Sequence, residues 1–132
     1  MVKTISISTT SRVEFLDITS KIEDIVEESG IRDGICYIFV PHTTAAVTIN
    51  EGADPSVRRD IIAQLDKIVP LRGNYTHMEG NSPAHIKASL IGSSQIVFVQ
   101  EGRISLGTWQ SIYFCEFDGP RTRRLIVKIT EK

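Results

Sequence analysis

The feature that most restricts the fold is a pair of apolar, β-rich segments near the end of the chain. They are TWQSIYFCEF (108–117) and TRRLIVKIT (122–130), and the turn sequence DGPR separates them. Gly and Pro in such a turn favour a hairpin between two long strands. Five earlier segments have the same strand character: VKTISIS (2–8), RVEFLDI (12–18), ICYIFVP (35–41), AAVTIN (45–50) and SQIVFVQ (94–100). The sequence therefore predicts a mostly antiparallel β structure.

Helix signals lie between these segments. Ser20 with Glu23 three residues later fits a capping box, and Gly30 would end the helix that they begin. Asp54-Pro55 and Ser82-Pro83 are typical starts of two further helices. Two or three helices against seven or so strands predict an α+β fold built as a β-sandwich, with residues 1–132 as one domain.

Composition excludes some classes of partner. Fifteen basic and sixteen acidic residues give a net charge of -1, so no general electrostatic attraction to nucleic acid or to an anionic membrane is expected. No apolar run reaches the roughly 18 residues of a membrane helix, and the N-terminus alternates instead of forming a signal sequence. A cytoplasmic protein is expected, with Cys36 and Cys115 as buried free thiols.

The histidines are the first candidates for chemistry. His42 follows a strand, His77 lies in the irregular segment LRGNYTHMEGNS, and His85 falls in the first turn of the third helix. Together they could bind a divalent metal such as zinc, with Glu51 or Glu79 as a further ligand. Their spacing matches no compact zinc motif, so the alternative is that each histidine only caps a helix end or loop.

Two further groups of polar residues could bind substrate. Asn50 and Glu51 could hold a hydrated Mg²⁺, which favours a few oxygen ligands together with substrate phosphate. Lys87, Arg103 and Arg121 could bind phosphate, helped by the N-terminus of the helix in GNSPAH. For Trp109, packing in a core or interface is favoured over a role as a stacking platform.

Three blocks resemble the YjbQ-like family, also called the secondary thiamine-phosphate synthase family. They are PHTTAAVTINEGADPSVRRDI, YTHMEGNSPAHIKASLIGSS and EGRISLGTWQSIYFCEFDGPRTRR, and the resemblance covers essentially the whole chain. It implies a jelly-roll-like β-sandwich that assembles as a homotrimer, with the histidine pocket at or near the subunit interface. His42, His77 and His85 match the motif histidines. The other matching residues are Asn50, Glu51, Asp54, Glu79, Asn81, Trp109 and Gln110.

The resemblance also implies an activity. It is thiamine-phosphate synthase activity, in which hydroxymethylpyrimidine diphosphate and thiazole phosphate are joined with release of pyrophosphate. In this interpretation His85, His42 and Glu51 are catalytic, and a divalent metal (Mg or Zn) assists. Phosphate-bearing substrate would contact Asn50, Asn81, Lys87, Arg103, Gln110 and Arg121. Two alternatives stay open: a metal-dependent hydrolase with a three-histidine site, and a non-catalytic trimeric binder of a phosphorylated metabolite.

Overall fold

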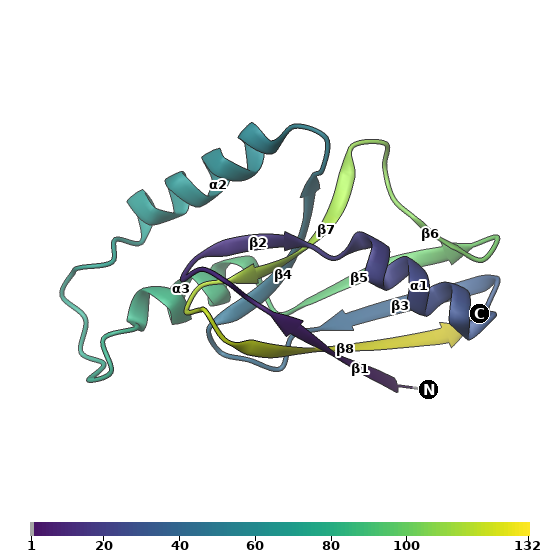
Figure 1. Cartoon of the computed structure of the whole chain (residues 1–132), viewed down its shortest axis with the longest axis horizontal. Helices are drawn as coiled ribbons and strands as arrows, with labels where there is room; N and C mark the ends of the chain where they lie inside the picture. The colour runs from purple at the N-terminus through teal and green to yellow at the C-terminus, as the bar shows by residue number, and fades with distance from the viewer. Residues whose placement is uncertain (1) are drawn as a thin grey trace.

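The computed structural model describes residues 2–132, and within this range the chain forms eight strands and three helices (Figure 1). The strands are β1 (Val2–Ser8), β2 (Glu14–Asp17), β3 (Asp33–Phe39), β4 (Ala45–Glu51), β5 (Ser94–Gln100), β6 (Arg103–Ser105), β7 (Gln110–Glu116) and β8 (Thr122–Glu131). The helices are α1 (Thr19–Ser29), α2 (Pro55–Ile68) and α3 (Ser82–Ile91). The expected single-domain α+β sandwich is confirmed.

The strands divide into two antiparallel sheets. The large sheet has the order β1-β8-β3-β5-β6, and the small sheet has the order β2-β7-β4. Alternation along the strands of the large sheet turns one set of apolar side chains inward, among them Ile7, Cys36, Val97 and Leu125. These side chains pack against α1 and against the facing side of the small sheet, which contributes Val47 and Phe114.

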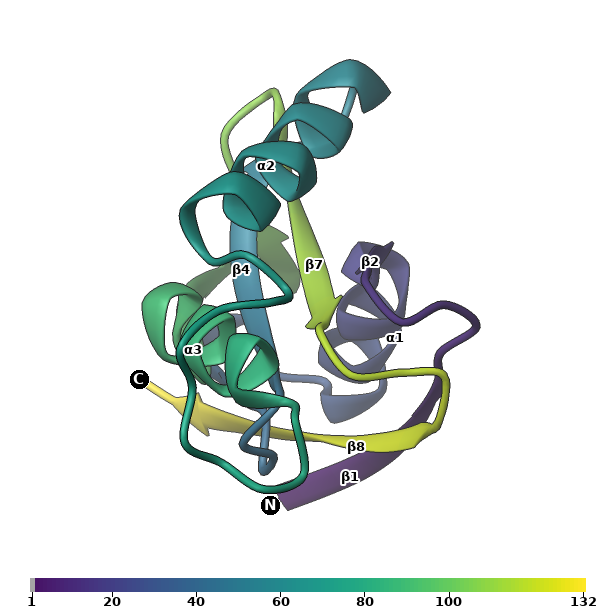
Figure 2. The same ribbon diagram turned by 90° about the vertical axis from the view of Figure 1, so that its left-hand side faces the viewer.

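The small sheet is covered on both sides. Its second face carries Phe15, Tyr113 and Cys115, which form a separate apolar cluster with Leu65 of α2 and Ala88 of α3. Figure 2 shows the result, with α3 beside β4 and α1 on the other side of β7. The small sheet is therefore a middle layer, whereas the outer face of the large sheet has no helix over it within residues 2–132.

The segment DGPR connects the two sheets and does not close a hairpin. β7 pairs with β2 and β4, while β8 pairs with β1 and β3, so the predicted hairpin is wrong. Gly119 lets this crossover pass close to β1–β2, because a Cβ atom there would collide with the carbonyl oxygen of Ser11. Its N–H donates to the Arg12 carbonyl oxygen at 3.0 Å. Turn residues thus mark a change of sheet here, not a pairing of neighbouring strands.

The helix boundaries follow most of the sequence signals. Asp54 caps α2 by accepting from the Ser56 N–H at 2.9 Å, and Gly30 ends α1 with a left-handed φ of 70°. The predicted capping box of α1 is wrong. Asp17 instead accepts from the Thr19 N–H at 2.9 Å, and the Glu23 side chain accepts from the Ile104 N–H on β6 at 3.2 Å. Across residues 2–132, no helix has the length and apolar character to span a membrane.

Candidate functional site

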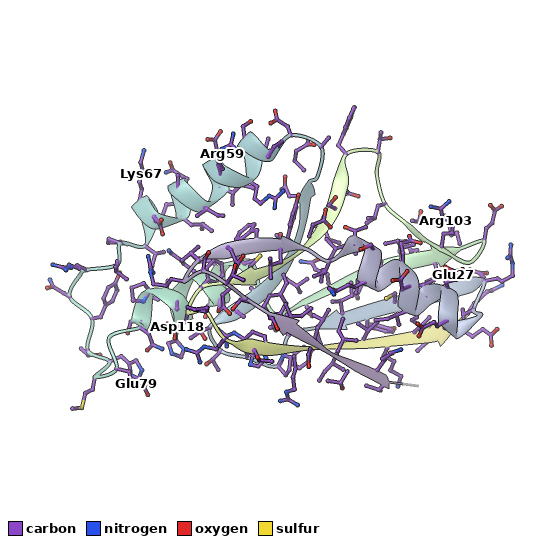
Figure 3. The ribbon with its side chains drawn as sticks, in the orientation of Figure 1. Glu27, Arg59, Lys67, Glu79, Arg103 and Asp118 are labelled. Carbon is purple, nitrogen blue, oxygen red and sulfur yellow. The ribbon has the colours of Figure 1, made fainter. Side chains whose placement is uncertain are left out.

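The three histidines of the chain line one polar pocket with a volume of about 700 Å³. Most of its lining comes from three segments: the turn after β3, the loop and first turn that begin α3, and the crossover between β7 and β8. Its polar lining residues are His42, Thr43, Thr44, His77, Glu79, Asn81, His85, Ser93, Asp118, Arg121 and Arg123. Figure 3 shows Glu79 and Asp118 at this end of the molecule and Arg103 at the opposite end. Residues that are far apart in sequence therefore meet here, such as His42 and His77, which are 35 positions apart.

His77 and His85 are in direct contact. Their rings meet edge to face, with centroids 5.4 Å apart and planes at 85°. His85 projects from the first turn of α3, while His77 comes from the long loop between α2 and α3, where its Nε2 lies 3.9 Å from Glu79 Oε1. The loop thus presents one imidazole to a second imidazole that the helix holds.

His42 is held by the neighbouring strand. Its Nε2 accepts a hydrogen bond from the backbone N–H of Arg124 on β8, at 2.9 Å. Burial of the imidazole and the positive charges of Arg123 and Arg124 lower the pKa of His42 from its ordinary value of 6.5. His42 is therefore held as a neutral ring at neutral pH.

An amide, a carboxylate and a guanidinium form the floor of the pocket beside the histidines. Asn81 Nδ2 donates to Asp118 Oδ2 at 2.9 Å, and Arg121 donates to the same Oδ2 at 3.2 Å and to the Asp118 carbonyl oxygen at 2.9 Å. The remaining polar atom of the amide, Asn81 Oδ1, is buried and accepts no hydrogen bond from residues 2–132. An unpaired buried acceptor is unfavourable by about 1–3 kcal/mol, so a hydrogen-bond donor that reaches Asn81 Oδ1 would be stabilising.

A buried ion pair supports the floor from below. Arg123 and Glu116 are buried, and Arg123 Nε donates to Glu116 Oε1 at 2.9 Å. Thr9 Oγ1 also donates to Glu116 at 2.8 Å, and Arg123 donates to Thr44 Oγ1 at 2.8 Å. This network joins the residue after β1 to β7, β8 and the turn after β3, so it fixes the segments that carry His42 and Asp118 relative to each other.

Asn50, Glu51 and Gln110 lie away from this pocket. They are at the opposite end of β4 and β7 from Thr44, and the seven residues of β4 span roughly 20 Å. Glu51 also has a structural contact, because its carboxylate accepts from the Ala53 N–H at 2.8 Å just before α2 begins. Within one chain, therefore, Glu51 does not lie beside His42 and His85, and neither Asn50 nor Gln110 lines the histidine pocket.

Lys87 and Arg103 also lie outside the pocket. Lys87 is only 3% exposed and forms an ion pair with Asp66 that links α3 to α2. Arg103 begins β6, with its Nε 4.0 Å from Glu23 of α1. Trp109 is 65% exposed in this chain, so it is not a core residue here. Of the residues expected to bind phosphate, the pocket contains Asn81 and Arg121.

One pocket residue, Asp118, and one residue of the buried ion pair, Glu116, were not predicted from the sequence. Asp118 was read only as a turn residue of DGPR, although a carboxylate directly after a buried strand is a signal of a site. Glu116 interrupts the apolar run IYFCEF, and a charge in such a run indicates a buried pair. Its partner Arg123 could not be chosen from sequence, because Arg121 and Arg124 were equally plausible.

The histidines do not form a ready metal centre. Among residues 2–132, no group of three or more His, Cys, Asp or Glu side chains is arranged to hold a metal ion. The contact of His42 with β8 gives one reason, since its Nε2 lone pair is already used. The three-histidine hydrolase hypothesis is therefore not supported. That a divalent Mg or Zn ion takes part in some other way stays a prediction.

Comparison with known proteins identifies the family and corrects the function. The family described as "UPF0047 protein YjbQ-like" matches residues 3–132. YugU of Bacillus subtilis, described as a UPF0047 protein, is 52% identical over 130 residues, covering 98% of each chain. A crystal structure of an uncharacterized YjbQ/UPF0047 protein from Clostridium acetobutylicum superposes with a TM-score of 0.95 at 55% identity, covering 97% of this chain and 99% of that one.

A more distant structure gives the same result. A protein of unknown function from Sulfolobus solfataricus, described as YbjQ-like, has a TM-score of 0.95 at 37% identity and covers 100% of this chain and 97% of its own. The descriptions of these relatives name a family or an unknown function and no synthase activity, so the assignment of thiamine-phosphate synthase activity is wrong as a conclusion about this chain. The family match over residues 3–132, the similarity over nearly the whole length and the shared fold agree: the chain belongs to the UPF0047 (YjbQ-like) family.

Proposed function

We propose that the pocket binds a small organic anion, carrying a carboxylate or a phosphate, and that the His77–His85 pair transfers a proton on the bound molecule. The observation that supports this proposal is that polar residues from separate segments meet in one pocket. All three histidines of the chain meet Arg121 and the unpaired Asn81 Oδ1 in one pocket, although they come from three separate segments. If the histidines only packed in the core or capped helices, they would not need to lie together in one pocket.

The polar groups define the ligand. Arg121 keeps guanidinium N–H groups beyond those used by Asp118, and a guanidinium matches carboxylate and phosphate oxygens. The pocket also adjoins the N-terminus of α3, where Asn81 makes no side-chain cap and backbone N–H groups favour an anion. Asn81 Oδ1 needs a donor, such as a hydroxyl group. The preferred ligand is thus an anion that also carries a hydrogen-bond donor.

The histidine pair supplies the chemistry. A neutral imidazole has one donor and one acceptor nitrogen, and histidine is the side chain most often used as a general acid or base. Two imidazoles in contact can therefore present an acid and a base to the same ligand. Neither role requires the three-ligand metal centre that residues 2–132 do not form.

Binding of inorganic phosphate tests the proposal. The probe is titrated into the purified protein and into two variants, Arg121→Ala and Arg103→Ala, with isothermal calorimetry as the readout. The two variants lose the same charge, but Arg103 lies at the far end of the molecule. We expect saturable binding that Arg121→Ala weakens about tenfold, which corresponds to the loss of one charged hydrogen bond. Equal weakening by both variants would contradict a local site.

We also propose that other copies of this chain cover the outer face of the large sheet, in the homotrimer that the family resemblance implied. Tyr37 pairs in register with Ile96, and Ile35 with Phe98, so their side chains form one apolar surface. Ile96 and Phe98 are 57% and 61% exposed in the single chain, which is unusual for large apolar groups gathered together. Phe39, at the edge of this surface, also lines the pocket, so a second copy there would reach the ligand.

Light scattering of the purified protein tests the assembly. We expect a mass of three chains for the wild type and a smaller species for Phe98→Asp. Met78→Asp is the matched control, because Met78 is also exposed but lies in the loop between α2 and α3. A monomeric wild type would contradict the assembly and leave the proposed ligand unaffected.

A further inference from the structure

The imidazole of His42 takes the place of a strand residue. The pairing of β3 with β8 ends at Phe39 and Ile126, and β8 itself begins earlier, at Thr122. Arg124 therefore lies on the part of β8 that β3 no longer covers. Its backbone N–H donates to His42 Nε2 at 2.9 Å, so the side chain completes the hydrogen bonding of the strand where the neighbouring backbone has turned away at Pro41.

This contact determines the position of the ring proton. A backbone N–H can only donate, so Nε2 must keep its lone pair. A neutral imidazole carries its single proton on the other nitrogen, which here is Nδ1. If Nε2 also carried a proton, its N–H would face the Arg124 N–H at a distance of 2.9 Å, and neither group could accept a hydrogen bond. The charged groups around the ring are Arg123 and Arg124, which disfavour a positive imidazole, and Glu116, which favours it.

We propose that His42 is a specificity-determining residue of the pocket: a neutral imidazole, fixed in the Nδ1–H tautomer by its bond from Arg124, that offers Nδ1–H to an acceptor atom of the ligand. The inference rests on the proposed function, because it takes the histidine pocket to be the binding site. His42 lines that pocket, and within residues 2–132 its Nδ1 has no hydrogen-bond partner. With Nε2 turned to β8, Nδ1–H is the polar group of the ring that remains for a ligand.

The three histidines would then have different roles. His42 neither accepts a proton nor binds a metal through Nε2, since either would break its bond to Arg124. Binding a metal through Nδ1 would move the proton to Nε2, against the same N–H. Proton transfer is thus left to His77 and His85, whose rings contact each other. A ligand with an oxygen acceptor opposite His42 is preferred over an analogue with a donor there, by about tenfold for one hydrogen bond.

Nitrogen-15 NMR of the imidazole rings tests the state of His42 in the free protein. Long-range ¹H–¹⁵N spectra distinguish a protonated ring nitrogen from one with a lone pair. We expect His42 at pH 8 to be protonated at Nδ1 and not at Nε2. A ring protonated at Nε2 at pH 8 would overturn the proposal.

Hydrogen exchange of the Arg124 amide provides the variant test. The amide is expected to exchange slowly in the wild type and at least tenfold faster in His42→Ala, whereas His42→Gln can accept the same bond and should remain closer to the wild type. Equal exchange in all three proteins would show that the bond is absent. If His42→Ala does not fold, the proposal is still tested by the wild-type NMR spectra and by the exchange rate of the Arg124 amide in His42→Gln.

Addition of inorganic phosphate separates this inference from the proposed function. We expect phosphate to shift the Nδ1–H signal of His42 without moving the proton to Nε2. Shifts at Asn81 and His85 with none at His42 Nδ1 would overturn the role of His42 and keep the pocket as the site. No shift at any pocket residue would overturn the proposed function, while the tautomer of the free protein would still support or exclude the neutral state of His42.

Discussion

His77 and His85 meet edge to face with ring centroids 5.4 Å apart, and this contact joins the loop between α2 and α3 to the helix that follows it. The loop is largely exposed, and Gly73, Gly80 and several polar residues give it few apolar anchors. The imidazole contact therefore both orders the loop and forms one wall of the pocket. The position of the loop and the proposed proton transfer in the pocket therefore depend on the same two side chains.

Replacing His85 should separate these two effects. His85→Ala is expected to weaken phosphate binding at least fivefold, because it removes a pocket group and releases His77. The free energy of unfolding should fall by only about 0.5–1.5 kcal/mol, the usual contribution of one aromatic pair. Calorimetry and urea unfolding provide the two values. Ser89→Ala, an exposed position on the same helix, serves as the control, and an equal loss of binding there would contradict a specific role for His85.

The buried ion pair beneath the pocket should be important for stability. Arg123→Met leaves Glu116 buried without its partner and is expected to lower the free energy of unfolding by about 3–5 kcal/mol. Arg124→Met, at the next and exposed position, should change it by less than about 0.5 kcal/mol. Urea unfolding of the two variants gives the comparison, and similar values would mean that the pair is not a structural support.

Glu116 should also make the stability depend on pH. Burial raises the pKa of this carboxyl, but its hydrogen bonds from Arg123, Asp118 and Thr9 outweigh burial and hold the pKa below its ordinary value of 4.5. A lowered pKa in the folded state contributes stability above about pH 4.5, which is lost as the pH falls through the folded value. The unfolding free energy of the wild type should therefore decrease more steeply below pH 4.5 than that of Glu116→Gln. Parallel curves would contradict this.

Lys87 and Asp66 should respond unequally to replacement. Lys87 is buried and Asp66 is about half exposed, so Asp66→Ala leaves an unpaired buried charge, with a loss of about 2–4 kcal/mol expected. Lys87→Met removes the buried charge and keeps a side chain of similar volume. Its loss in the free energy of unfolding should therefore be at least about 1 kcal/mol smaller than that of Asp66→Ala. Thermal unfolding of both variants measures the two losses of stability. A larger loss in Lys87→Met than in Asp66→Ala would show that Lys87 is not effectively buried.

Much of the fold could be predicted from local signals. Alternation located the strands, and Asp54 and Gly30 marked helix boundaries because each satisfies a backbone requirement within a few residues. The hairpin at DGPR was wrong because turn chemistry does not specify which strands pair. The capping box at Ser20 failed for a related reason, since Glu23 bonds to β6, 81 residues away.

The site was only partly accessible from the sequence. The histidines were found because each lies in a loop or near the end of an element, where side chains are often exposed. Asn50 and Glu51 were grouped with His42 because they are near in sequence, but β4 is extended and carries them to its other end. The tautomer of His42 depends on a backbone N–H 82 residues away, which no local pattern indicates.

A crystal structure of the protein grown with phosphate would test the central claim most directly. The account predicts an ordered phosphate ion in the histidine pocket, with oxygen atoms within hydrogen-bonding distance of Arg121 and of His42 Nδ1, and with His85 beside it. An empty histidine pocket in crystals that hold ordered phosphate at another basic position, such as Arg103, would contradict it.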